Sequence, residues 1–132
     1  MGVRSCYRHD STKTFSCRSA ACRGPVPWIA FHLHSSCSWL VDVVLDVDGI
    51  NVVEMGDDAN VVRLEKIIPI WKKIQEKKPC IVYRDATPEE LERILGELSP
   101  VGLSVQTFAS TLADAVANRE VVYEQADELC QE

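Results

Sequence analysis

Two apolar stretches flank Asp48-Gly49 within residues 41–55, VDVVLDVDGINVVEM. Asp and Gly tolerate the positive φ angles of a two-residue type I′ turn, and such a pair between alternating apolar residues is a strong hairpin signal. With this turn, Val47 lies opposite Ile50 on the neighbouring strand. A one-residue slip of the pairing would bury aspartates, so the register is well specified. The segment therefore predicts a β-hairpin against which the rest of the chain packs.

The two faces of this predicted hairpin differ in polarity. One face is apolar except for Glu54 at its far end, and it is expected to face the core. The opposite face mixes polar and apolar residues, so we expect it to be partly wet or covered by something else. Its members that we take as candidate binding residues are Asp42, Val44, Asn51, Val53 and Met55.

The same letters carry a second interpretation. VVLDVDG resembles the first motif of haloacid-dehalogenase-like phosphatases, an apolar strand that ends in Asp-x-Asp-Gly. The resemblance implies that Asp46 is the nucleophile and Asp48 the general acid of a magnesium-dependent phosphatase. It covers seven residues, and Ile50 stands where the family usually has Thr or Val. A plain hairpin turn is the alternative for this motif.

Length and composition favour one globular domain. The chain has 132 residues, 46% of them hydrophobic, which is enough to bury a core. A net charge of -6 argues against general nucleic-acid binding, which needs cations to replace phosphate counterions. Apolar runs are too short for a membrane-spanning helix. We therefore expect a cytoplasmic protein that binds neither nucleic acid nor membrane.

The N-terminal segment differs in charge from the rest of the chain. Residues 1–38 contain five basic residues and one acidic residue, whereas the remainder contains 9 and 19. Residues 1–24 also lack apolar periodicity, so we expect a disordered tail there and a single domain over residues 25–132. A targeting peptide and a start codon assigned too early are the alternatives.

Cysteine and histidine spacing gives little sign of a metal site. No pair among the six cysteines has Cys-x-x-Cys spacing, and we expect reduced thiols. Residues 27–34, PWIAFHLH, are expected to form an extra strand at a sheet edge, from which His32 and His34 project together. Two histidines without a third ligand are half of a metal site at most. We predict no cofactor and no metal.

The remaining chain alternates between helix and strand patterns. A helix capped by Asp57 or Asp58 is expected to run to about Lys77, with Pro69 inside it. Strand patterns follow at residues 80–85 and 103–108. Thr87 is the expected cap of the helix between those strands, and Ser110 or Thr111 that of the last helix. The last helix is expected to bury the following residues: Leu112, Ala115, Val116, Val122, Tyr123, Ala126 and Leu129.

These elements predict an α/β fold, with α+β as the alternative. Because the strands alternate in polarity, we expect a two-layer sandwich with helices on one face of a mixed sheet and the other face open. The order, a hairpin followed by α-β-α-β-α, is similar to that of anti-sigma-factor-antagonist (STAS-like) domains. Their phosphorylatable Asp-Ser-Ser-Gly loop is absent from this sequence.

Two classes of function are compatible with the sequence. The first is a non-catalytic interaction or regulatory domain that binds a protein partner, or forms a homodimer, through the open sheet face. The second is the magnesium-dependent phosphatase that Asp46 and Asp48 imply through the family resemblance. The first is favoured because the C-terminal part contains no phosphate loop, no metal-ligand spacing and no nucleophile-and-base set.

Overall fold

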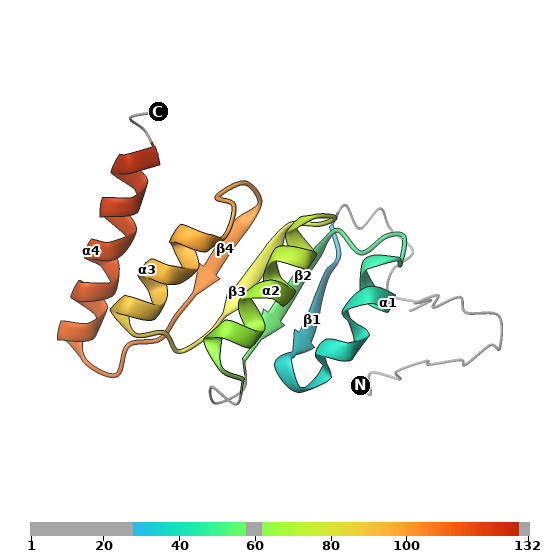
Figure 1. Ribbon diagram of the computed structural model, residues 1–132, viewed down its shortest axis with the longest axis horizontal. Coiled ribbons are helices and arrows are strands. Elements are labelled where there is room, and N and C mark those ends of the chain that lie inside the picture. Colours follow the sequence, from blue (N-terminus) through green and yellow to red (C-terminus); the bar gives the residue numbers. More distant parts are fainter. Residues whose placement is uncertain (1–27, 58–61, 130–132) are drawn as a thin grey trace, which may run out of the picture.

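Four strands alternate with helices in the computed structural model, which describes residues 28–57 and 62–129 (Figure 1). The expected tail at residues 1–24 lies outside that description. A short 3₁₀ helix, η2, follows the first strand and continues into the first α-helix. The elements are β1 (Ala30–His34), η2 (Ser35–Leu40), α1 (Val41–Leu45), β2 (Val52–Gly56), α2 (Leu64–Gln75), β3 (Cys80–Tyr83), α3 (Pro88–Glu97), β4 (Leu103–Gln106) and α4 (Leu112–Leu129).

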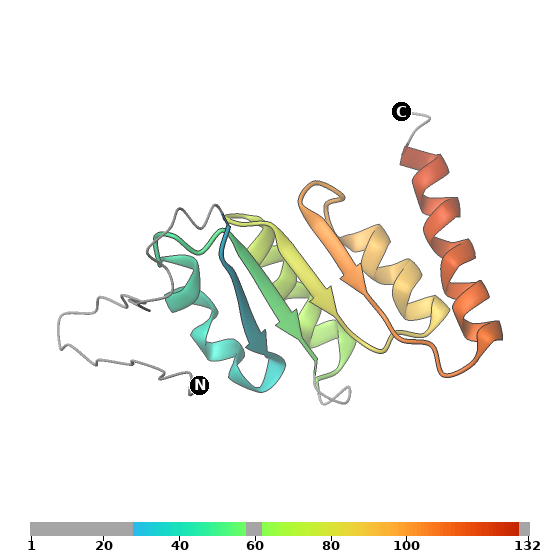
Figure 2. The ribbon, with the colours of Figure 1, turned by 180° about the vertical axis from the view of Figure 1, so that it is seen from behind.

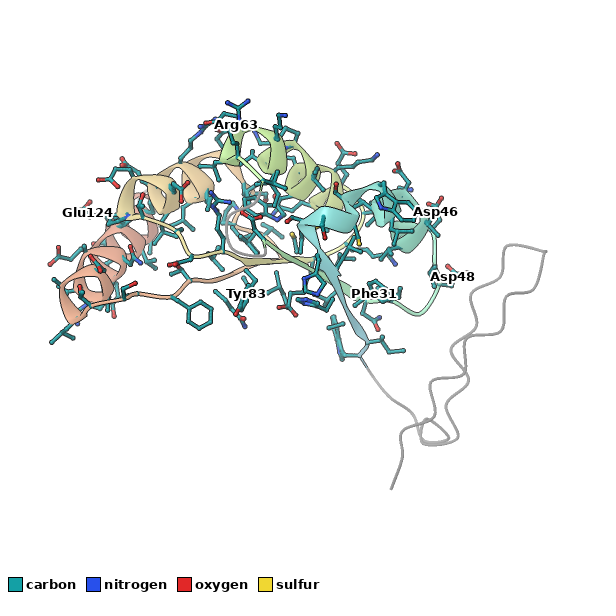
Figure 3. The ribbon with its side chains drawn as sticks, turned by 90° about the horizontal axis from the view of Figure 1, so that it is seen from below. Phe31, Asp46, Asp48, Arg63, Tyr83 and Glu124 are labelled. Carbon is teal, nitrogen blue, oxygen red and sulfur yellow. The ribbon has the colours of Figure 1, made fainter. Side chains whose placement is uncertain are left out.

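The sheet is wound in a single direction. Its spatial order is β1-β2-β3-β4, and all three neighbouring pairs are parallel. Each new strand is added at the same edge, so right-handed crossovers place every helix on the same face. Figure 3 shows the helices in an arc over that face. The two-layer α/β sandwich is therefore confirmed, but the sheet is parallel rather than mixed.

The alternation of side chains along each strand explains which residues form the core. Paired positions across the four strands point the same way, so one set of side chains faces the helices throughout. In β2 and β3 these side chains are fully buried, whereas in the edge strands some are only partly buried. The helix-facing residues are Phe31, Leu33, Val53, Met55, Cys80, Val82, Leu103 and Val105.

The predicted hairpin at residues 41–55 is wrong. Residues 41–45 form the helix α1 instead. Its buried side chains, Val41, Val44 and Leu45, have the spacing of one helix face. The turn chemistry was correct in part, since Gly49 has a φ of 91° in the loop after α1. β2 pairs with β1, which lies earlier in the chain. Without a leading hairpin, the element order also departs from that of STAS-like domains.

Helix α2 has the predicted apolar stripe but starts later than expected. Leu64, Ile67, Ile68, Trp71 and Ile74 are all buried, and Pro69 lies inside the helix as predicted. Asp57 does not cap it: Arg63 occupies the N-cap position, and no side chain bonds there. Asp58 lies outside the described residues.

Helix α3 confirms its predicted cap. The side chain of Thr87 accepts a hydrogen bond from the Glu90 backbone N–H at 3.2 Å, and Pro88 begins the helix. Helix α4 is likewise preceded by Thr111, whose Oγ1 accepts a bond from the Asp114 N–H at 3.2 Å. None of the described helices is long and apolar enough to cross a membrane.

The predicted buried stripe of α4 is wrong. Leu112 is 83% exposed and Tyr123 is 62% exposed. Val121 packs against the core and Asn118 is buried instead. The physical reason is position, since α4 follows the last strand and its outer side has no neighbour within the described chain (Figure 1). The side chain of Leu129 lies outside the described part.

Candidate functional site

The sheet face opposite the helices is uncovered in the described part of the chain (Figure 2). Its side chains come from the alternate positions of all four strands. Unlike the helix-facing set, most of them are half-buried or exposed. The residues of this uncovered face are Ala30, His32, His34, Val52, Glu54, Gly56, Ile81, Tyr83, Ser104 and Gln106.

One end of the uncovered face carries a histidine cluster. His32 Nδ1 lies 3.3 Å from Glu54 Oε1, and the rings of His32 and His34 meet edge to face at 4.5 Å. Gly56 provides the space, because a Cβ there would lie 3.2 Å from Cε1 of His32. The prediction that the two histidines project together is confirmed.

An aromatic pair occupies the other side of the same face. The rings of Tyr83 and Phe108 lie 5.2 Å apart in an edge-on arrangement. Phe108 follows β4 and is 55% exposed. Half-buried Ile81 precedes Tyr83 on the same face of β3. Aromatic and aliphatic groups beside hydrogen-bonding side chains are typical of the centre of a protein interface.

A buried ion pair lies where β2 and β3 end. Arg84 Nη1 donates to Asp57 Oδ2, and both side chains are almost fully buried. Oδ1 of Asp57 accepts bonds from Ser35 Oγ at 2.9 Å and from the Val62 N–H at 3.2 Å. Glu90 accepts from Arg84 Nη2 at 2.9 Å. The network therefore joins the ends of three strands to α3.

The charged side chains of this network already bond to one another. Arg84 also donates to the Val62 carbonyl at 3.0 Å, so its guanidinium is engaged on several sides. A shallow depression beside it is lined by Leu64 with three arginines and three glutamates, so opposite charges balance there. Charges that already neutralise one another have little attraction left for a ligand. We do not place a catalytic site here.

The predicted binding residues do not lie on the uncovered face. Val53 and Met55 are fully buried against the helices, and Val44 is buried on α1. Asp42 pairs with Lys73 of α2 at 2.6 Å, and the Asn51 side chain accepts a bond from the Ile29 N–H at 2.9 Å. The predicted hairpin paired β2 with the wrong segment. The prediction therefore exchanged the buried and the exposed face of this strand.

Sequence reasoning missed the actual residues of this face in β3. Cys80 and Val82 are fully buried and alternate with half-buried Ile81 and Tyr83. All four are apolar or aromatic, so polarity alone did not separate the two faces. The mixed content of β2 and β4 was the available signal, since Glu54 and Gln106 mark the wet face.

Neither aspartate of the phosphatase interpretation lies on a strand. Asp46 is the C-cap of α1 and pairs with Lys77 at 2.8 Å. The hydrogen bond from Lys77, followed by its charge, lowers the pKa of Asp46. Asp48 is exposed in the loop before β2. A nucleophile at the carboxyl end of a strand, which the family resemblance implies, is thus not formed.

Metal ligation has no support in the described chain. Within residues 28–57 and 62–129, no three His, Cys, Asp or Glu side chains are grouped so that they could hold an ion.

Burial raises the pKa of the Cys80 thiol to about 12, so this cysteine stays protonated at neutral pH.

Comparison with known proteins gives no relative: no protein-family model, no curated protein and no solved structure matches this chain.

Proposed function

We propose that this chain is a non-catalytic interaction domain that self-associates through the uncovered face of its sheet. One observation carries the proposal. The sheet is entirely parallel, yet within residues 28–57 and 62–129 helices cover one face only. Parallel sheets are found almost only with both faces covered, so we expect the second face to be covered as well.

The character of the face supports a second copy as that cover. The chain carries a net charge of -6, but Glu54 is the only Asp, Glu, Lys or Arg of the uncovered face, and it lies against His32. Two such faces approach each other without strong like-charge repulsion. Val52, Ile81 and Tyr83 supply apolar area, and Ser104 and Gln106 supply hydrogen-bonding groups. A two-fold axis makes one face serve both partners.

The test is the solution mass of the whole chain, measured by light scattering over a range of concentrations. We expect the mass of two chains at high concentration. Ile81→Lys should return the mass to one chain without unfolding, because that side chain points away from the helices. Glu92→Lys is the control, since Glu92 is exposed on the outer surface of α3, away from the uncovered face, and it should leave the dimer intact.

Two results would contradict the proposal. One is a wild-type chain that stays monomeric at high concentration. The other is an Ile81→Lys variant that is folded and still dimeric. If the wild type is monomeric and a chain without residues 1–27 dimerises, the face is covered by the chain's own N-terminal segment instead.

A further inference from the structure

Exposed apolar side chains gather at the two ends of the sheet. In the described chain, every clearly exposed large hydrophobic residue belongs to the first or the last strand-helix unit. The described residues of the two central units, built around β2 and β3, include none. Those at the β1 end are Trp28, Ile29, Trp39 and Val43, and those at the β4 end are Val101, Phe108, Leu112, Val116, Val122 and Tyr123. The edge strands β1 and β4 also each lack a neighbour on one side within the described residues.

Helix α4 extends past the end of the sheet. It packs on α3 and lies beyond β4 (Figures 1 and 2). A depression of about 470 Å³ lies between α4 and the β4 end, where Val105, Phe108, Ala115 and Val122 are among its lining residues. Asn118 also lines it, is only 6% exposed, and has a side-chain oxygen without a hydrogen-bond partner in the described structure. This side of α4 therefore leaves unfilled space beside the β4 edge of the sheet.

A second group of apolar side chains on α4 is exposed. Leu112, Val116 and Tyr123 follow a spacing of four and then seven residues, which places them on one stripe of the helix. Val121, which packs on the core, lies on the opposite side. Exposed apolar residues that gather on one side of an element are typical of a surface that a partner covers.

We propose that the two copies of the dimer close edge to edge, so that β4 of each chain pairs with β1 of the other. This inference rests on the proposed function, because the uncovered faces then both turn inward. A two-fold axis along the strand direction keeps all eight strands parallel. It also makes the two seams, where β4 of one chain meets β1 of the other, identical. The product is an eight-stranded parallel barrel with its helices outside.

The closed arrangement accounts for three features at once. An eight-stranded barrel has an interior just wide enough for side chains to fill, which gives the uncovered face its cover. α4 lies over the seam between β4 and the partner's first strand. Its Leu112, Val116 and Tyr123 stripe meets the partner's first helical segment. The strand ends from both copies, including Tyr83 and Gln106, then surround one mouth that neither copy forms alone.

Amide hydrogen exchange tests the seam. The carbonyls of Gly102 and Gln106 accept bonds from β3 at 2.8 and 3.0 Å, so alternation directs the Val105 N–H outward from the edge of the sheet. In the barrel this amide is bonded. We expect it to exchange at least about tenfold more slowly in the wild-type dimer than in monomeric Ile81→Lys. The Ser104 amide faces β3 and should be protected in both.

A substitution on α4 provides an independent test. Val116→Arg should weaken dimerisation at least about tenfold, because it puts a charge where α4 meets the other chain. Glu124→Arg is the control on the same helix, at an exposed position outside the apolar stripe, and should leave the dimer intact (Figure 3).

The outcomes separate the two proposals. A dimer with a slowly exchanging Val105 amide and sensitivity to Val116→Arg supports the barrel. If the Val105 amide of the dimer exchanges as fast as in the monomer, or if Val116→Arg does not weaken dimerisation, the barrel proposal is wrong. A dimer in which the uncovered faces simply pack on each other then remains the account. A mass above two chains also overturns closure. A monomeric wild type overturns both proposals.

Discussion

At the scale of single residues, Arg84 is a buried cation that depends on its partners. It is buried with Asp57 and bonded to Glu90. Removing one partner of a buried ion pair leaves an uncompensated charge, so Arg84→Met should lower the free energy of unfolding by about 3–5 kcal/mol. Urea denaturation measures this loss.

Arg93 is the matched control for that prediction. It pairs with Glu97 at 2.8 Å and with Glu65 at 3.1 Å, but on the exposed surface of α2 and α3. Arg93→Met should lower the free energy of unfolding much less than Arg84→Met, because water screens exposed ion pairs. Equal losses for the two substitutions would show that the Asp57–Arg84 pair does not act as a buried link between the elements.

The two free cysteines of the described chain are predicted to differ in reactivity. Burial raises the pKa of Cys80 to about 12, whereas Cys37 is only half-buried. In the folded protein at pH 8, a thiol reagent should label Cys37 and leave Cys80 unmodified, as peptide mass spectrometry can read out. Rapid labelling of Cys80 under native conditions would place β3 outside the core.

At the scale of elements, side-chain burial in β2 and β3 shows which face of the sheet is exposed to solvent. Val53 is fully buried against the helices, while Ile81 of β3 lies on the uncovered face. Val53→Lys should therefore destabilise the fold by more than about 4 kcal/mol, because it buries an unpaired charge. Ile81→Lys should leave thermal unfolding of the monomer nearly unchanged. The reverse result would mean that the two faces are exchanged.

The carboxylates that join α1 to α2 and α2 to α3 give stability a pH dependence. A hydrogen bond from Lys77 lowers the pKa of Asp46, and hydrogen bonds from Lys72 and Arg93 lower that of Glu97. A lowered folded-state pKa means that the contribution is complete above the ordinary values of 3.8 and 4.5 and is lost as the pH falls through the folded values. Unfolding free energy should therefore fall below about pH 4.5, and less steeply in high salt.

Local sequence signals predicted the helices better than the strand partners. The α2 stripe and the Thr87 cap depend on neighbours within a few residues, and both were predicted. The partner of β2 depends on β1, whose paired residues lie 22 positions earlier in the chain, and no local pattern specifies that pairing. The wrong hairpin then reversed the predicted wet face, so Val53 and Met55 were misplaced while Ile81 and Tyr83 were missed.

At the scale of the whole molecule, the proposed dimer would explain what the separate elements do not. Apolar residues of α4 were predicted to be buried, and in the single chain several are exposed. The sequence pattern and the fold agree if those residues are buried between copies. The proposed dimer would also cover the uncovered face of the parallel sheet and both of its edges.

Association through the uncovered face can be followed residue by residue as amide chemical shifts during dilution. In a nitrogen-proton correlation series, we expect concentration-dependent shifts for Glu54, Ile81 and Tyr83. The Glu92 amide, on the exposed outer surface of α3, should stay constant as an internal reference. Shifts confined to the helix layer, or no shifts in the three face residues up to millimolar concentration, would contradict association through this face.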